Sequence, residues 1–376
     1  MRVVVIVDRA FGRAEAAMLA RLQIGLADEG HRVVHAAPVA TIATEQSAVY
    51  STTVGYVDTG LPFTLRSRVA VLVETLKALA EKQGDRGPVH VVHALGGRTW
   101  PAAIELSRQT GSAMVIELDR ASLLPASGTL AREPEPSGRG DAAPVPLFSV
   151  PDDRLRIELL RRSPRARVCV ARWGVHVPAY RHARSGAPAL ALLVERGDSR
   201  SAIAVLEALA GIVRDAPDLM VFVDIVDGRT ASVWRAARKL GLLERLSMVP
   251  EMEARRDPVL QMDALLLPDA AGASHSLSLD AMAAGMAVIA SPDALNETLI
   301  DGKTARLVAV PTKTDWERAI REAVLDGERW SLLGASSREY IGINRPVSGH
   351  IGSVIAAYHQ AQRFHESDRS LPVAAA

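Results

Sequence analysis

Short apolar runs alternate with segments of helical spacing along the chain, and this alternation limits the fold more than any other feature. The first run, Val3–Val7, is entirely β-branched, as expected for a strand buried on both faces of a parallel sheet. Residues 14–29 follow with apolar side chains at helical spacing, Gly30 stands where a helix C-cap is expected, and Val33–Ala37 is the next run. A strand, a helix and a second strand in this order begin a doubly wound α/β fold.

The alternation occurs twice, which predicts two Rossmann-like domains. The linker between the two series is Ser185–Pro188, a short segment that contains glycine and proline. We therefore expect an N-terminal domain over residues 1–184 and a C-terminal domain over 189–345. Residues 346–376 follow as a last helix and a frayed tail. At 376 residues the chain is long enough for two domains of ordinary size.

One stretch interrupts the alternation. Between Leu124 and Pro151 lie six prolines and three glycines, with little periodicity. This composition predicts a long surface loop, which is unusual inside a compact domain. The sequence leaves two interpretations open for it, a lid over a site or an insertion without a role.

Composition excludes several classes of protein. The 44 Lys and Arg residues nearly cancel the 43 Asp and Glu residues, and aromatic residues make up 4%. These values argue against a nucleic-acid partner, which needs a basic face and base-stacking side chains. The single cysteine, Cys169, excludes an internal disulfide and a cysteine-based zinc site. No apolar stretch approaches the ~20 residues of a membrane span, so we expect a cytoplasmic protein without a transmembrane segment.

Several motifs are rejected on their context. No G-x-G-x-x-G follows the first strand, so a dinucleotide cofactor is not expected. Gly302–Thr304 imitates the end of a P-loop, but no strand leads into it and we interpret it as a turn. Ser274 and His275 lack the surroundings of a hydrolase nucleophile. His90 and His93 would face opposite sides of one strand and cannot hold one metal, so no metal site is predicted.

The segments that remain resemble a known family in their order and wording. Leu279–Val308 is the most specific, and it is similar to the pattern LEAMACGxPVVAS…PEIVxDGxTGxLV. Arg167–His176 is the next most specific. Both resemble the retaining glycosyltransferases of family 4, and the resemblance runs from the first strand to about Tyr358.

The resemblance implies the GT-B architecture, in which two Rossmann-like doubly wound domains face each other across a cleft. It implies that residues 346–376 cross back onto the N-terminal domain, which would lie on the acceptor side. The C-terminal domain would bind a nucleotide-sugar donor. The implied reaction is a retaining, metal-independent transfer of the hexosyltransferase type, without a cofactor, to an acceptor that is a glycan, a lipid or a small molecule.

The resemblance also implies roles for residues of the second half. Arg196 and Arg200 follow its first strand, where the family has a GR…K pair, and we expect them to stabilise the diphosphate leaving group. Asp280 would accept hydrogen bonds from the donor ribose. Ser276 would lie at the start of the helix that holds Asp280, and Ser276 or Ser278 would cap it. Glu297 would orient the loop around the nucleotide or cap the helix that we expect after it.

Three residues of the first half complete the predicted donor site. Gly12 lies in the loop that we expect after the first strand, where a glycine lets the backbone approach a ligand closely. His93 lies near the end of a strand, at the expected ligand edge of the sheet. Asp119 aligns with a histidine that the family often has after its fourth strand.

The chain departs from the family nearest the chemistry. The family has two glutamates in an E-x7-E motif, and here the second aligns with Asp280 and the first with Gly272. One carboxylate is therefore shortened and the other is absent. Two rival readings follow: a non-catalytic GT-B protein that binds or scaffolds, and another GT-B enzyme such as a nucleotide-sugar epimerase.

Overall fold

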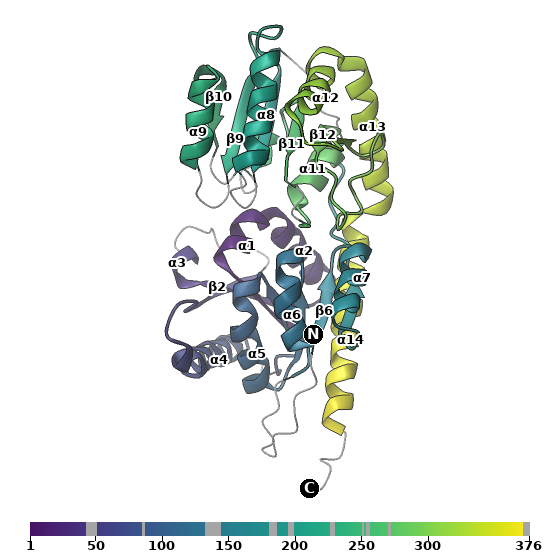
Figure 1. The fold of residues 1–376 in the computed structure, drawn as a ribbon. Helices are drawn as coiled ribbons and strands as arrows, with labels where there is room; N and C mark the ends of the chain where they lie inside the picture. Colours follow the sequence, from purple (N-terminus) through teal and green to yellow (C-terminus); the bar gives the residue numbers. More distant parts are fainter. Residues whose placement is uncertain are drawn as a thin grey trace. The chain divides into compact units, whose positions relative to one another are not determined.

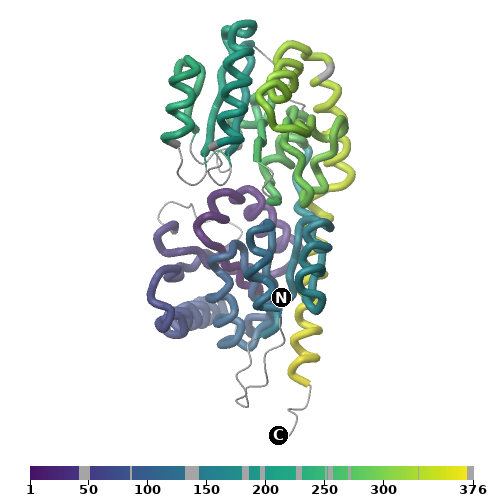
Figure 2. The backbone as a smooth tube through the Cα atoms, viewed as in Figure 1, coloured from purple at the N-terminus to yellow at the C-terminus, as the bar shows by residue number. Residues whose placement is uncertain are grey.

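The computed structural model of the chain describes residues 1–42, 51–84, 87–131, 144–179, 186–194, 199–225, 230–249, 252, 256–269 and 272–370. The chain divides into two compact units. Unit 1 comprises Met1–Trp173 together with Val347–Ala376, and unit 2 comprises Gly174–Pro346. Each unit is a parallel sheet flanked by helices, as the ribbon shows (Figure 1), and Figure 2 traces the backbone of both units along the sequence.

The sheet of unit 1 has seven strands in the order β3-β2-β1-β4-β5-β6-β7, all of them parallel to their neighbours. Strand β1 lies between β2 and the central strand β4, and its Val5 pairs with His35 on one side and with His93 on the other. The order reverses between β1 and β4, which is the type of position where doubly wound sheets bind ligands. The strands are β1 (Arg2–Val7), β2 (Arg32–Pro38), β3 (Thr52–Tyr56), β4 (Val91–Leu95), β5 (Ala113–Glu117), β6 (Leu147–Val150) and β7 (Arg167–Val170).

The helices of unit 1 follow the amphipathic segments of the sequence. Their longer members bury one apolar stripe each, as Val69, Leu72 and Leu76 do in α4. Gly111 ends α5 in the left-handed conformation, at φ 64°. The helices are α1 (Arg9–Ala14), α2 (Ala16–Asp28), α3 (Val39–Ile42), α4 (Leu65–Lys82), α5 (Trp100–Thr110), α6 (Leu124–Leu130), α7 (Asp153–Arg162) and α14 (Val347–Ser370), with 3-10 turns η1 (Pro62–Thr64), η2 (Gly97–Thr99) and η3 (Ala121–Leu123).

The last helix, α14, packs on β4, β5, β6 and α2 of unit 1. Its buried stripe contains Ile351, Val354 and Tyr358, whereas Ile355 is half-buried. A glycine in α2 makes the close approach possible, because a Cβ on Gly25 would lie 2.5 Å from the Ile351 side chain. Arg167 of β7 holds the far end of α14 through two bonds to Asp368, at 2.6 and 2.7 Å.

The prediction of one long loop between Leu124 and Pro151 is wrong. Helix α6 occupies its first residues, and strand β6 its last, where β6 pairs with β5 on one side and β7 on the other. All four residues of β6 are buried. Residues 132–143, on which the lid interpretation depends, lie outside the described part of the chain. Strand β3 was also not predicted from the sequence.

The sheet of unit 2 has six parallel strands in the order β10-β9-β8-β11-β12-β13. A hydrophobic cluster that includes Leu192, Leu206 and Trp316 packs helices against it. Its strands are β8 (Ala189–Val194), β9 (Met220–Ile225), β10 (Leu246–Met248), β11 (Ala264–Leu267), β12 (Ala287–Ala290) and β13 (Arg306–Leu307). Its helices are α8 (Ser199–Ile212), α9 (Thr230–Lys239), α10 (Arg256–Val259), α11 (Ser276–Ala284), α12 (Lys313–Leu325) and α13 (Gly327–Asn344), with the 3-10 turn η4 (Leu243–Arg245).

Two further sequence interpretations concern the P-loop-like segment Gly302–Thr304 and membrane-spanning helices. Gly302–Thr304 does form a turn, with Gly302 at φ 70° and the Lys303 amide bonded to the carbonyl of Ile300 at 3.1 Å. Among the helices of the described part of the chain, none is both long and apolar enough to cross a bilayer.

Candidate functional site

The predicted donor residues of unit 2 lie after the carboxyl ends of β11 and β12, and helix α11 is the central element there. All nine residues of α11 are buried. Its N-cap is His275, in an extended conformation, and the His275 side chain makes no cap hydrogen bond. The prediction that a serine caps this helix is wrong, because Ser276 already belongs to the helix and the Ser278 hydroxyl donates to the His275 carbonyl at 2.7 Å.

Asp280 lies one turn into α11 and is 8% exposed. Its helix starts after β11 and leads into β12, so this carboxylate is placed on the segment that joins two neighbouring strands of the sheet. Ser276, at the start of the same helix, is fully buried. The structure thus brings Ser276 and Asp280 onto one short helix, and their contact with a donor stays a prediction.

Gly272 stands where the family motif has its first glutamate, and the backbone conformation at this residue favours glycine. Its φ is 61°, in the left-handed region that L side chains rarely adopt. Its amide donates to Asp293 Oδ2 at 2.7 Å, and Asp293 Oδ1 accepts from the Leu295 amide at 2.8 Å. Asp293 therefore ties the loop after β11 to the loop after β12.

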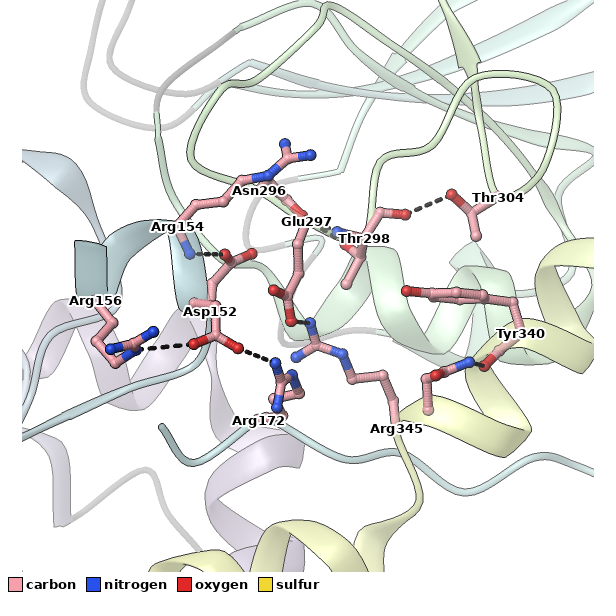
Figure 3. Close-up of polar contacts among 12 residues, drawn as sticks. Asp152, Arg154, Arg156, Arg172, Asn296, Glu297, Thr298, Thr304, Tyr340 and Arg345 are labelled. Carbon is pink, nitrogen blue, oxygen red and sulfur yellow. Dashed lines mark hydrogen bonds and ion pairs between the residues drawn. The ribbon is translucent and has the colours of Figure 1, made fainter. Parts of the chain in front are cut away.

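Glu297 pairs with Arg345 rather than capping a helix. The Arg345 Nη2 atom lies 2.7 Å from Glu297 Oε1, and the Arg345 side chain is only 3% exposed (Figure 3). No helix follows Glu297 between Glu297 and Arg306, so the capping alternative is wrong. The Arg345 carbonyl accepts from the Val175 amide at 2.9 Å. Glu297 is thus fastened to the last residues of unit 2, just before α14 begins.

A second set of contacts fixes the segment around Glu297. Asn296 Oδ1 accepts from the Thr298 amide at 3.0 Å and from the Thr298 hydroxyl at 2.6 Å. The Thr304 hydroxyl donates to the Thr298 carbonyl (Figure 3). The same hydroxyl accepts from the Ile300 amide at 2.8 Å. Lys303 lies over the Tyr340 ring, 4.9 Å from its centroid. These contacts hold the loop through side chains and backbone groups of the chain itself.

The two predicted catalytic arginines have different outcomes. Arg200 is the second residue of α8, the helix that follows β8 in the chain, and it is exposed. Arg196 lies outside the described residues. Convergence of the two guanidinium groups on one phosphate therefore stays a prediction.

In unit 1, His93 lies in the middle of a strand, among buried polar side chains. It is the middle residue of β4 and 1% exposed. Its Nδ1 lies 2.9 Å from the Tyr358 hydroxyl of α14, and its Nε2 lies 3.6 Å from Glu117 Oε2. The other oxygen of Glu117 accepts from Trp173 Nε1 at 2.7 Å. Burial, with the nearby Glu117 charge, raises the pKa of the Tyr358 hydroxyl well above its ordinary value.

The same environment acts on the single cysteine. Burial, assisted by the Glu117 charge, raises the pKa of the Cys169 thiol to about 12. A thiol with such a pKa is protonated at neutral pH and is a poor nucleophile. The Cys169 Sγ atom donates to the Phe148 carbonyl of the neighbouring strand β6 at 3.6 Å.

Asp119 and Gly12 are placed by short local contacts. Asp119 is 1% exposed and pairs with Arg120 at 2.6 Å. Gly12 lies in helix α1, not in a loop, and its amide donates to the Asp8 carbonyl at 2.9 Å. Asp8 caps α1 by accepting from the Phe11 amide at 2.8 Å. The expectation of an open glycine loop after β1 is therefore wrong.

Several residues that make these contacts were not predicted from the sequence. They are Asp293, Arg345, Glu117, Tyr358 and Trp173. Each acts through a partner far along the chain, so spacing carried no signal for them. Only Gly272, a glycine where a carboxylate was expected, pointed to unusual backbone near Asp293. Among the described side chains, no group of three or more His, Cys, Asp or Glu is placed to hold a metal ion.

Comparison with known proteins decides the fold. No protein-family model matches the chain, and no curated protein matches it in sequence. Solved structures do: a glycosyltransferase from Rickettsia africae has a TM-score of 0.68 at 12% identity, over 96% of this chain and 98% of its own. The chain has the GT-B fold.

Two further GT-B structures agree with this assignment. Sucrose-phosphate synthase from Thermosynechococcus elongatus has a TM-score of 0.70 at 16% identity, over 96% of this chain and 99% of its own. HepE from Anabaena, solved in complex with UDP and glucose, has a TM-score of 0.70 at 12% identity, over 96% of this chain and 100% of its own. The predicted fold class, α/β with two Rossmann-like units, is confirmed.

Proposed function

We propose that the chain is a glycosyltransferase that moves a sugar from a nucleotide-diphosphate donor to a separate acceptor. The GT-B fold supports this, since the similar structures include a glycosyltransferase and HepE with UDP and glucose. The single observation that carries the proposal is the buried carboxylate of Asp280 on α11, between β11 and β12. Open α/β sheets bind their ligands at such carboxyl ends.

Within this proposal, unit 2 binds the donor. Asp280 accepts hydrogen bonds from the two ribose hydroxyls. The positive end of the α11 dipole and the guanidinium groups of Arg200 and Arg196 meet the negative charge of the diphosphate. The loop fastened by Arg345 to Glu297 lies at the same edge and limits the room around the nucleotide.

The finer proposal is a retaining, metal-independent transfer of a hexose. The bond between the sugar and the diphosphate breaks, and the acceptor hydroxyl forms the new bond on the same face of the sugar while its proton leaves with the diphosphate. The arginines stabilise the charge that develops on the leaving group, which is electrostatic preorganisation. Unit 1 supplies the acceptor side in this proposal.

Gly272 favours a second candidate, a non-catalytic GT-B protein that binds or scaffolds. Gly272 has no side chain that could contact a donor sugar. The nearby carboxylate of Asp293 accepts hydrogen bonds from the amides of Gly272 and Leu295. The two candidates differ in turnover, and both allow nucleotide binding. Release of nucleoside diphosphate from a nucleotide sugar therefore separates them.

The test of donor binding starts from a thermal-shift panel of nucleosides, nucleoside diphosphates and nucleotide sugars. A true ligand at 100 times its Kd adds about 2.7 kcal/mol to the free energy of unfolding. Calorimetry then compares wild type with Asp280→Ala, which we expect to lose roughly 1.5–3 kcal/mol of binding free energy for the best diphosphate. Glu339→Ala, an exposed carboxylate on α13, is the matched control and should bind as wild type does. Equal affinity in all three proteins would remove Asp280 from the site.

The arginines are tested by the same titrations. The double change of Arg196 and Arg200 to alanine should abolish the preference for a diphosphate over a nucleoside and leave nucleoside binding unchanged. Lysine at both positions should restore only part, because lysine keeps the charge and loses the planar fork. A wild-type protein without preference for the diphosphate contradicts the arginine roles. Turnover that persists in excess chelator, with the product anomer identified by NMR, tests the metal-independent and retaining parts.

A further inference from the structure

A pocket of about 340 Å³ lies in unit 2 apart from the predicted donor residues. It is formed between β13, α12 and α13, and its lining includes Arg306, Glu322 and Trp330. Arg306 begins β13, which is the edge strand of the sheet and runs parallel to β12. The pocket therefore borders the amino-terminal end of an edge strand, whereas the donor residues follow the carboxyl ends of strands. Its volume is at the small end of ligand pockets, which span about 300–1,000 Å³.

Two of the residues that line this pocket each carry a buried hydrogen-bond donor without an acceptor among the described residues. Trp330 is 8% exposed, and its Nε1 has no hydrogen-bond partner among the described residues. The same is true of Arg306 Nε, which is also buried. Buried donors are almost always paired in native proteins, so two of them on one pocket need an explanation. A ligand that brings acceptor oxygens would satisfy both.

The charges around the pocket indicate whether the ligand group that supplies these acceptor oxygens is anionic, cationic or neutral. Arg306 Nη1 lies 3.6 Å from Asp301 Oδ1, and Arg306 Nε lies 3.9 Å from Glu322 Oε2. Both distances exceed a hydrogen bond, although the two carboxylates still offset the arginine charge. An anionic ligand would meet two carboxylates, and a cation would leave both N–H groups unpaired. The fitting group is neutral, accepts from Arg306 and Trp330, and donates to Glu322, which describes a hydroxyl.

The remaining lining is apolar with one further hydroxyl. Leu332 is 67% exposed, and Leu333 lies beside it on α13 with Ser336 one turn further on. An exposed leucine next to a tryptophan that lacks a hydrogen-bond partner gives the pocket one apolar side and one polar side. A sugar ring has the same division, with C–H groups on its faces and hydroxyls around its rim.

We propose that this pocket binds a neutral sugar residue at a site separate from the donor site. Hydroxyls of the sugar accept from Trp330 Nε1 and Arg306 Nε, and one of them donates to the Glu322 carboxylate. Leu332 and Leu333 cover a face of the ring. The proposal does not depend on the proposed glycosyl transfer, because it is built from residues that have no part in donor binding.

The test uses the full chain and the five tryptophan indole N–H signals in a ¹H–¹⁵N NMR spectrum. The Trp330 signal is assigned by its loss in Trp330→Phe. Glucose, galactose, mannose and N-acetylglucosamine are titrated separately, and at least one should shift that signal with saturation. Sodium sulfate and choline serve as the anionic and cationic probes and should leave it in place.

Variants then separate binding from folding. Trp330→Phe keeps the apolar ring and removes the N–H, and Arg306→Gln acts on a side chain that is 30% exposed. Each should weaken the best sugar roughly five- to tenfold, measured by saturation-transfer NMR, since each removes one hydrogen bond. Trp316→Phe is the matched control: its Nε1 is also buried without a partner among the described residues, but Trp316 does not line the pocket. It should bind the sugar as wild type does.

The outcomes are decisive in both directions. A selective, saturable shift of the Trp330 signal that persists at saturating nucleotide, with both pocket variants weakened and the control unchanged, establishes the site. Absence of a shift with every sugar overturns the proposal and leaves water as the occupant. A larger response to sulfate or choline, or equal losses in Trp330→Phe and Trp316→Phe, also overturns it. Failure of nucleotide binding, by contrast, would affect only the proposed function.

Discussion

The two units use the residues at and beyond the ends of their parallel strands in different ways. In unit 1, Glu117 at the end of β5 accepts from Trp173 with one oxygen, its other oxygen lies 3.6 Å from His93 Nε2, and Tyr358 of α14 contacts the other ring nitrogen of His93. In unit 2, the corresponding segments carry Asp280 on a helix and Glu297 in a loop, where Glu297 pairs with Arg345. The comparison teaches that a polar residue near a strand end is placed by the fold, and that its partners decide whether a ligand can use it.

If the network of unit 1 is structural, its loss should cost stability more than any change at the edge of unit 2. Trp173 is 1% exposed, contacts the Phe11 ring edge-on at 6.1 Å and donates to Glu117. We expect Trp173→Ala to lower the free energy of unfolding by roughly 3–5 kcal/mol, because it opens a large cavity and leaves a buried carboxylate without its donor. Urea unfolding followed by circular dichroism measures the change.

The control for this prediction is an aromatic residue of the same unit without packing. Phe63 is 80% exposed in the turn η1, and Phe63→Ala should leave the urea midpoint within experimental error. Similar losses in the two variants would contradict the assignment of the network to the stability of unit 1.

The ion pair of unit 2 gives the next largest expected effect. Arg345 is buried, so Glu297→Gln removes the charge that balances it. We expect a loss of roughly 1.5–3 kcal/mol in the free energy of unfolding, the range of hydrogen bonds to charged groups. A double-mutant cycle with Arg345→Met measures the coupling between the two residues. A coupling near zero would show that Glu297 is held by other contacts and would return it to the list of candidate ligand residues.

Sequence reasoning reached the fold because the fold depends on local patterns. The valine run of β1 predicted a strand buried on both faces, and all six residues of β1 are buried. It missed β6 because four residues between Pro146 and Pro151 are too few to show a period. It misplaced His93 for a different reason: the Tyr358 hydroxyl that contacts it comes from a position 265 residues later in the chain. Contacts of that kind are set by packing and leave no spacing to read.

A buried histidine in unit 1 extends the comparison to pH. Burial lowers the pKa of His35, in β2, to about 4 from its ordinary value of 6.5. Its folded-state pKa is therefore depressed, so the unfolded chain binds the proton first as pH falls below about 6.5, and stability is lost from there down to about pH 4. Between pH 8 and pH 5 this single group should lower the free energy of unfolding by about 2 kcal/mol.

The variant His35→Gln isolates this contribution. It should flatten the fall in unfolding free energy between pH 8 and pH 5, measured by urea titrations at several pH values. His359, exposed on α14, is the control, and His359→Gln should keep the wild-type slope. An unchanged slope in His35→Gln would show that His35 does not remain neutral in the folded protein.

The smallest expected effect concerns the backbone of the edge of unit 2, and it differs in sign from a matched change in unit 1. Gly272 has φ 61°, so Gly272→Ala places a Cβ in the left-handed region and should destabilise the protein by about 1 kcal/mol. Gly352 lies within α14, is exposed and would leave an added Cβ free of contacts within 4 Å, so Gly352→Ala should stabilise by roughly 0.5–1 kcal/mol. Both changes reduce the freedom of the unfolded chain alike, and their difference therefore reports the native backbone. If both melting temperatures rose, residue 272 would have relaxed to an ordinary conformation, and the left-handed backbone would not account for the glycine.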